Sequence, residues 1–158
     1  MTSWKTLIVG SALALLAPLA FAQSGSDNSI GTWKLNLAKS TFGSESPPKG
    51  ETRTYSQTPQ GTHVVIEDEL ANGQKTKSEV TLTYDGKPQK LSGSPDYDAV
   101  VTHRVDAYET TADLIRNGKV VGQLRRVVSK DGKTLTINQK RTKADGTTET
   151  ALSIYERQ

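Results

Sequence analysis

Cysteine is absent from the 158 residues of the chain, which excludes a disulfide framework and thiolate metal sites. Motifs of several common catalytic classes are absent as well. The sequence has no G-x-S-x-G nucleophile turn, no H-E-x-x-H zinc motif, no Walker phosphate loop and no dinucleotide fingerprint. A chain of this size must therefore be stabilised by core burial, and no standard catalytic motif indicates its function.

A block of like charge is also missing. Lys and Arg number 20 and Asp and Glu number 17, and the two signs alternate along the chain. Nucleic acids and anionic lipid surfaces are bound by clustered basic residues, and the sequence has no such cluster. We therefore expect neither as a partner.

Residues 1–22 have the three parts of a secretory signal peptide. Lys5 is the positive residue, an apolar run follows from Leu7 to Ala17, and Ala20-Phe21-Ala22 forms an A-x-A cleavage site. The apolar run is shorter than the roughly 20 residues that span a bilayer. We therefore expect cleavage near Ala22, export to the periplasm or the medium, and no stable membrane insertion of the mature chain. Loss of Lys5 leaves a net charge of +2.

The mature chain is expected to be one domain over residues 30–158, preceded by a flexible leader over residues 23–29, which is rich in Ser, Gly, Asp and Asn. Turn signals recur along the domain, and the Asn-Gly and Asp-Gly pairs among them predict type I′ hairpins. These pairs are Asn72-Gly73, Asp85-Gly86, Asn117-Gly118, Asp131-Gly132 and Asp145-Gly146. Longer loops are expected over 38–50 and 92–96.

Between the turns, apolar and polar residues alternate as in half-buried strands, and Thr and Val dominate. The predicted inward rows are Trp33/Leu35/Leu37, Val64/Ile66/Leu70, Val80/Leu82/Tyr84, Ala99/Val101/His103/Val105, Val120/Gly122/Leu124/Arg126/Val128, Leu135/Ile137/Gln139/Arg141, and either Leu152/Ile154 or Ala151/Tyr155. The sequence thus predicts an all-β domain of eight to ten strands. Short hairpins make it an antiparallel meander, which removes its exposed edges by closing into a barrel.

The opening Gly31-Thr32-Trp33-Lys34-Leu35 resembles the G-x-W strand of the calycin superfamily, which includes lipocalins and fatty-acid-binding proteins. The end, Ile154 to Arg157, resembles the closing strand of fatty-acid-binding proteins. The mature stretch also resembles small exported bacterial lipocalin-like proteins of unassigned function, through Gly31 to Asn36, Lys39-Ser40 and Ser129 to Thr136. The resemblance implies a barrel with Trp33 plugging its closed end and an arginine, Arg141 or Arg157, packed over the ring.

Three departures separate the chain from fatty-acid-binding proteins and lipocalins. A Pro-Gly loop over 44–50 replaces the helix-turn-helix of fatty-acid-binding proteins, and Ser153 stands where their carboxylate-binding pair has its arginine. The chain also ends in a strand, where lipocalins often add a helix. The barrel carries over from the resemblance, but a fatty-acid function does not carry over by residue.

Five residues are candidates for a site. Arg126 and Arg141 fall in inward rows, where an arginine must be paired or hold an anion, and Tyr155 is a possible second donor. His103 falls in an inward row, where it is either a ligand, a base or a partly buried rim residue. His63 shares a strand face with Glu67. The two could bind a metal weakly, but the surrounding charges favour a solvated strand face. No metal is expected, because no ligand cluster has the usual spacing.

The leading hypothesis is an exported barrel that binds a small apolar or amphipathic molecule, with Arg126, Arg141, Tyr155 and His103 as ligand-binding residues. No cofactor is indicated, although haem or another small ligand is left open. A second hypothesis is a small-barrel hydrolase or isomerase that uses His103 or His63 with a carboxylate. A third is an envelope-interaction module whose barrel is filled by its own side chains and binds nothing.

Overall fold

The computed structural model describes residues 27–44, 46–143 and 145–158. The predicted signal peptide and residues 23–26 of the predicted leader lie outside the described residues. Among those that are described, no helix is long and apolar enough to span a membrane.

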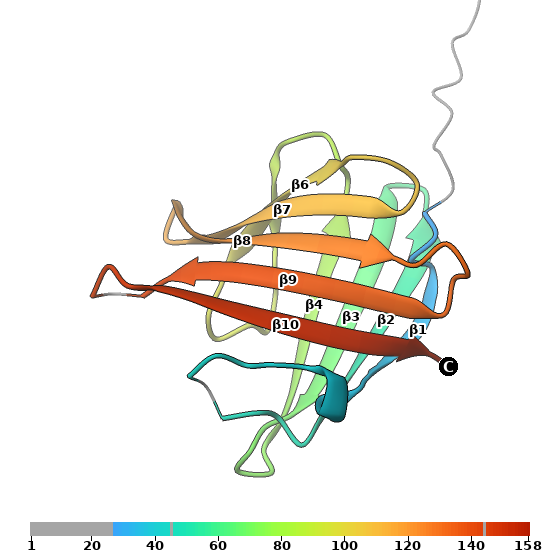
Figure 1. Ribbon diagram of the computed structural model, residues 1–158. Helices are drawn as coiled ribbons and strands as arrows, with labels where there is room; N and C mark the ends of the chain where they lie inside the picture. The colour runs from blue at the N-terminus through green and yellow to red at the C-terminus, as the bar shows by residue number, and fades with distance from the viewer. Residues whose placement is uncertain (1–26, 45, 144) are drawn as a thin grey trace, which may run out of the picture.

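Ten antiparallel strands form a single sheet in the described part of the chain (Figure 1). They are β1 (Gly31–Leu35), β2 (Gly50–Thr58), β3 (Gly61–Glu69), β4 (Lys75–Leu82), β5 (Pro88–Lys90), β6 (Ala99–Arg104), β7 (Glu109–Arg116), β8 (Lys119–Val128), β9 (Thr134–Thr142) and β10 (Thr148–Arg157). A short 3-10 helix, η1 (Leu37–Lys39), follows β1. The strand order is β4-β3-β2-β1-β10-β9-β8-β7-β6-β5, so the predicted antiparallel meander is confirmed.

Pairing of the first and last strands curls the sheet into a nearly closed barrel. β1 pairs with β10, with Trp33 opposite Arg157. The two ends of the sheet meet where Glu79 of β4 and Ser92, just after β5, exchange two backbone hydrogen bonds of 2.9 Å. Figure 1 shows β7–β10 crossing in front of β1–β4, with the interior between the two layers.

Most of the predicted inward rows are confirmed. Buried side chains from nine strands form one core, and those from the predicted rows include Trp33, Leu35, Val64, Val80, Leu82, Val128, Leu135 and Ile137. On β8 the inward row begins at Gly122, because a register shift in the pairing with β7 leaves Val120 59% exposed. On β10 the buried alternative is the row that ends at Tyr155.

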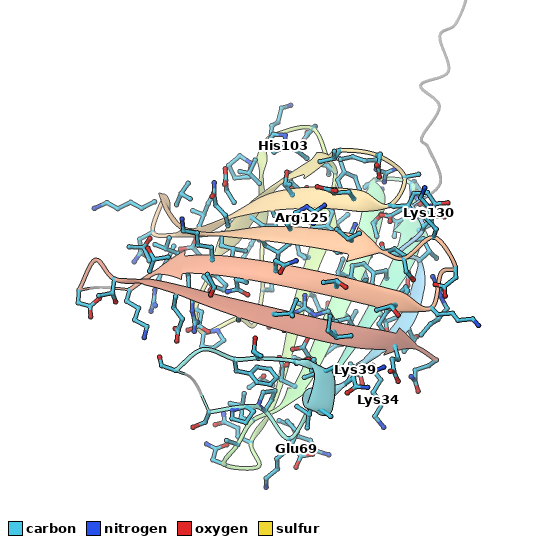
Figure 2. The ribbon with its side chains drawn as sticks, in the orientation of Figure 1. Lys34, Lys39, Glu69, His103, Arg125 and Lys130 are labelled. Atoms are coloured by element: carbon cyan, nitrogen blue, oxygen red, sulfur yellow. The ribbon has the colours of Figure 1, made fainter. Side chains whose placement is uncertain are left out.

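The predicted face of β6 is wrong. Val100 and Thr102 are buried, whereas His103 is exposed and Val105 is 58% exposed. Valine stands at both 100 and 101, so alternation alone fits either register. Pairing decides it, since Val100 lies opposite the buried Leu114 of β7. Figure 2 shows His103 on the outside of the barrel, as it does the charged Lys34 and Lys130.

The type I′ prediction holds for one of the five turns. Asn117 and Gly118 both have positive φ, at 52° and 73°. In the other four Asn-Gly and Asp-Gly pairs only the glycine has positive φ, so the I′ prediction is wrong there. These loops are longer, and an Asx hydrogen bond shapes them: Asp131 Oδ1, for example, accepts from the backbone N–H of Lys133 at 3.1 Å.

Candidate ligand-binding cavity

The barrel encloses a cavity of about 550 Å³ that reaches the surface at one end. Three loops contribute residues to this end: Phe42, Ser46 and Pro48 between β1 and β2, Leu70 to Asn72 between β3 and β4, and Ser94 to Tyr97 between β5 and β6. Cavities of roughly 300–1,000 Å³ are typical of small-molecule sites. The barrel is therefore not filled by its own side chains.

The wall of the cavity is mostly apolar. It is formed by inward residues from β2, β3, β4, β6, β7, β8, β9 and β10, among them Tyr55, Val64, Ile66, Val80, Leu82, Val100, Ala112, Leu114, Leu124, Ile137 and Ala151. Hydroxyl and amide groups are interspersed, including Thr76, Ser78, Gln139 and Ser153. Such a lining suits an apolar body with a few polar groups.

Trp33 lies at the opposite, closed end and is fully buried. Its indole N–H donates to the Ser29 carbonyl at 2.7 Å. The guanidinium of Arg157 lies 4.2 Å from the ring centroid, while its N–H groups donate to the carbonyls of Asn28 and Ile30. Of the two arginines expected over this ring, Arg157 packs on it and Arg141 does not.

Arg126 lines the cavity from β8, as its inward row predicts, and its side chain is 6% exposed. It donates to the Thr110 hydroxyl at 2.9 Å and to the Tyr84 hydroxyl at 3.1 Å, and it lies over the Tyr55 ring with its carbon 4.8 Å from the centroid. Its ion-pair partner is Asp27, at 3.5 Å. The arginine is therefore held within the protein.

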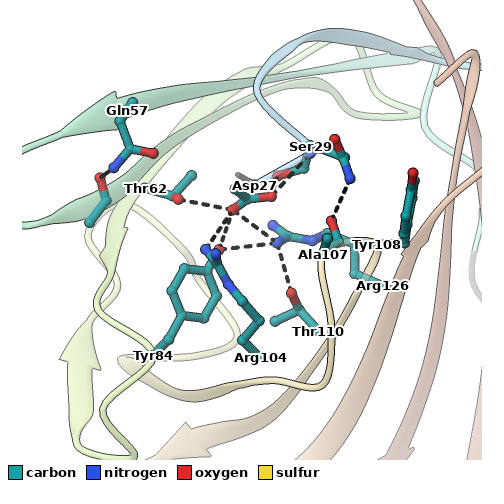
Figure 3. A network of polar contacts seen from close by, with 12 residues as sticks. Asp27, Ser29, Gln57, Thr62, Tyr84, Arg104, Ala107, Tyr108, Thr110 and Arg126 are labelled. Atoms are coloured by element: carbon teal, nitrogen blue, oxygen red, sulfur yellow. Dashed lines mark hydrogen bonds and ion pairs between the residues drawn. The ribbon is translucent and has the colours of Figure 1, made fainter. Parts of the chain in front are cut away.

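Asp27 is the centre of this network (Figure 3). Its carboxylate accepts from the hydroxyls of Ser29 (2.6 Å), Thr62 (2.9 Å) and Tyr84 (2.6 Å), and Arg104 adds a second ion pair at 3.5 Å. Burial opposes ionisation, but the charge of Arg126 and the hydrogen bonds outweigh it and lower the pKa of Asp27 to about 2. Asp27 and Ser29 were expected in a flexible leader; the structure packs them into the closed end instead.

A second charged cluster, which the sequence analysis missed, lies in the wall on β2 and β3. Glu51 forms a short ion pair with Arg53 and accepts from the Tyr155 hydroxyl at 2.7 Å. Asp68 lies directly opposite Glu51 in the strand register. Burial, together with the charge and hydrogen bond of Glu51, raises the pKa of Asp68 to about 7. A signal existed in the sequence, since Glu51, Arg53 and Tyr55 alternate with two threonines, as residues on one face of a strand do.

Tyr155 thus orients Glu51 rather than facing the cavity, whose lining does not include it. Arg141 does line the cavity, and it pairs with Glu149 at 3.2 Å. Glu149 also accepts from the backbone N–H and the hydroxyl of Ser44, both at 2.5 Å, and so ties the β1–β2 loop to β10.

The two histidines do not enter the cavity. His103 is exposed on β6, and His63 on β3 contacts the Thr81 hydroxyl of β4 at 3.4 Å. Within the described residues, no group of three or more His, Asp or Glu side chains could hold a metal ion.

Comparison with known proteins places the fold. No protein-family model matches the chain, and no curated protein matches it. Among solved structures, the zebrafish ileal bile acid-binding protein complexed with cholic acid is similar, with a TM-score of 0.53 and 11% identity over 83% of this chain and 99% of that one. The chain has a calycin-like barrel. The siderocalin Ex-FABP is another structure with some similarity, at a TM-score of 0.38 and 16% identity over 83% of this chain and 74% of that one.

Proposed function

We propose that the protein is a binding protein whose calycin-like barrel holds one small apolar or amphipathic molecule. The observation that carries this proposal is the enclosed cavity of about 550 Å³, with its apolar wall and interspersed polar groups. Burial of the apolar body supplies the affinity, at about 25 cal/mol for each Å² removed from water. Arg126 and Arg141, the two predicted ligand residues that line the cavity, act as hydrogen-bond donors to the polar end.

The structural neighbour supports this proposal by analogy of fold. The zebrafish protein, which aligns with 83% of this chain, is complexed with cholic acid. Its identity of 11% carries no residue over to this chain, so the ligand must be argued from the wall itself.

The cellular site is part of the proposal. The signal-peptide pattern of residues 1–22 supports export, with binding in the periplasm or the medium. Kinship with the small exported bacterial lipocalin-like proteins stays a prediction from the G-T-W-K-L-N opening and the late strand.

A pair of variants on one strand tests the cavity. Ala151 lines the cavity from β10, and its neighbour Thr150 is exposed on the other face. Ala151→Phe places a ring in the cavity, and Thr150→Phe places the same ring in solvent. Binding is measured by the fluorescence of N-phenyl-1-naphthylamine, an uncharged apolar probe.

We expect the wild type and Thr150→Phe to bind the probe equally, and Ala151→Phe to bind it at least about tenfold more weakly, since the loss of apolar burial is worth more than 1 kcal/mol. No binding by the folded wild type, or equal binding by Ala151→Phe, would contradict the proposal.

A further inference from the structure

We infer that the cavity selects an uncharged amphiphile over an anionic one, because carboxylates of the protein itself neutralise the arginines of its wall. The inference rests on the ligand-binding function proposed above. Three arginines line the cavity in the described part of the chain: Arg53, Arg126 and Arg141. An anion would need at least one of them.

Arg126 already has a carboxylate partner from the protein itself. Asp27 Oδ2 lies 3.5 Å from its Nη2, and both side chains are only 6% exposed. The same Nη2 donates to the Thr110 and Tyr84 hydroxyls. Asp27 comes from the segment before β1 and reaches Arg126 from the closed end, outside the cavity lining, so a ligand in the cavity does not displace it.

Arg53 is neutralised in the same way from its own strand. Glu51 pairs with it, and the two side chains are 12% and 17% exposed. The Tyr155 hydroxyl fixes Glu51 with a hydrogen bond of 2.7 Å, and the Arg53 guanidinium lies 5.2 Å from the centroid of the Tyr155 ring. Breaking such a buried pair leaves an uncompensated charge, which is strongly unfavourable.

Arg141 completes the set near the mouth. It pairs with Glu149 at 3.2 Å, and Glu149 also lies 3.4 Å from Lys143 Nζ. Glu149 is 8% exposed and is fixed by Ser44. Every arginine of the described wall therefore has a carboxylate partner supplied by the chain.

The wall has carboxyl groups besides these partners. Asp68 faces Glu51 across the β2–β3 pairing, and Asp96 lies at the mouth. The groups that act on Asp68 are Glu51 and Arg53 from β2 and Thr76 from β4, and the repulsion by Glu51 is larger than the attraction by Arg53. A ligand anion would lose its hydration and meet this negative charge. An uncharged hydroxyl or amide is not repelled by this charge and can hydrogen-bond to groups such as Ser78 and Ser153.

Three probes with the same tail test the inference: decanol, decanoate and decylamine. Each is titrated against the folded, purified protein at pH 8, where Asp68 is mostly ionised, by displacement of N-phenyl-1-naphthylamine. We expect decanol to bind at least about tenfold more tightly than decanoate. Equal or tighter binding of decanoate than of decanol overturns the inference, and so does weaker binding of decylamine than of decanoate. Failure of the fluorescent probe itself to bind would contradict the proposed function instead.

Charge variants show whether the preference among the probes comes from the charges of the wall or from differences between the probes themselves. Asp68→Asn removes a cavity charge, and Glu67→Gln removes the adjacent charge on the exposed face of the same strand. The decanoate-to-decanol affinity ratio should rise by about threefold or more in Asp68→Asn and stay unchanged in Glu67→Gln.

Glu51→Gln releases Arg53 and should raise the same ratio by about tenfold or more. Far-UV circular dichroism checks that this variant folds. If it does not fold, the ratio in Asp68→Asn decides, and an unchanged ratio there overturns the inference.

Discussion

Asp27 contributes to stability through its ionised carboxylate, which Arg126, Arg104 and three hydroxyl groups hold at the closed end of the barrel. Its pKa is about 2 in the folded protein, below the value of about 3.9 in an unfolded chain. A carboxyl whose folded pKa is depressed stabilises the fold above its unfolded pKa, and the stabilisation is lost as the pH falls through the folded value.

The prediction for Asp27 concerns acid unfolding. Between about pH 4 and pH 2 this group should remove about 2–3 kcal/mol from the free energy of unfolding of the wild type. Asp27→Asn should be less stable at pH 7 by about 3 kcal/mol, because Arg126 loses its buried partner, and should lack this part of the acid slope. Urea unfolding at a series of pH values measures both. Parallel slopes in the two proteins would contradict the assignment.

At the scale of residues, the sequence indicates which side chains face inward but not which of them pair. Arg126 was predicted from its row, and it does face the cavity. Its partner Asp27 lies almost one hundred positions away, in a segment whose Ser, Gly, Asp and Asn composition is typical of a flexible leader. Alternation carries no information about such distant pairs, so Asp27 was missed as the partner of Arg126.

Among the described residues, the seam between β4 and β5 has a single backbone bridge, Glu79–Ser92, where other neighbouring strands pair over several residues. Gly93 makes this contact possible. Its φ is +79°, and a Cβ on it would lie 2.0 Å from the carbonyl oxygen of Lys77 on β4. Any side chain there must push the two edges apart.

Gly118 offers a matched control for Gly93. Its φ is +73°, but a Cβ there would meet no atom within 4 Å. Gly118→Ala should therefore lose only about 1 kcal/mol for its left-handed backbone, whereas Gly93→Ala should lose at least about 2 kcal/mol more from the clash. Chemical unfolding measures the difference, and hydrogen exchange at the Glu79 amide should rise only in Gly93→Ala. Equal losses in the two variants would show that the seam is not closed as described.

At the scale of elements, the meander, the strand number and most inward faces follow from the sequence, because strand alternation and turn residues are local signals. The errors arise where local signals are ambiguous. On β6 two adjacent valines fit either face, and the pairing with β7 decides. At Asp131-Gly132 the dipeptide suits a two-residue turn, but Ser129 and Thr134 close a longer loop.

On the scale of the whole molecule, the cavity lowers stability, because its lining side chains lack packing partners on one side. The same space allows a ligand to stabilise the fold. A molecule that binds only the folded state adds RT ln(1 + [L]/Kd), which is about 2.7 kcal/mol at a concentration of one hundred times Kd. Ligand affinity and ligand-induced stabilisation therefore both report how well a molecule fills the cavity.

The last prediction joins them. Decanol at about one hundred times its Kd should raise the melting temperature of the wild type by several degrees. Ala151→Phe fills part of the cavity, so without ligand it should melt at the same temperature as the wild type or higher, and decanol should not shift it. Thr150→Phe should respond to decanol as the wild type does. If decanol still raises the melting temperature of Ala151→Phe, the ligand binds outside the cavity, because the phenylalanine ring occupies the space in the cavity that decanol would need.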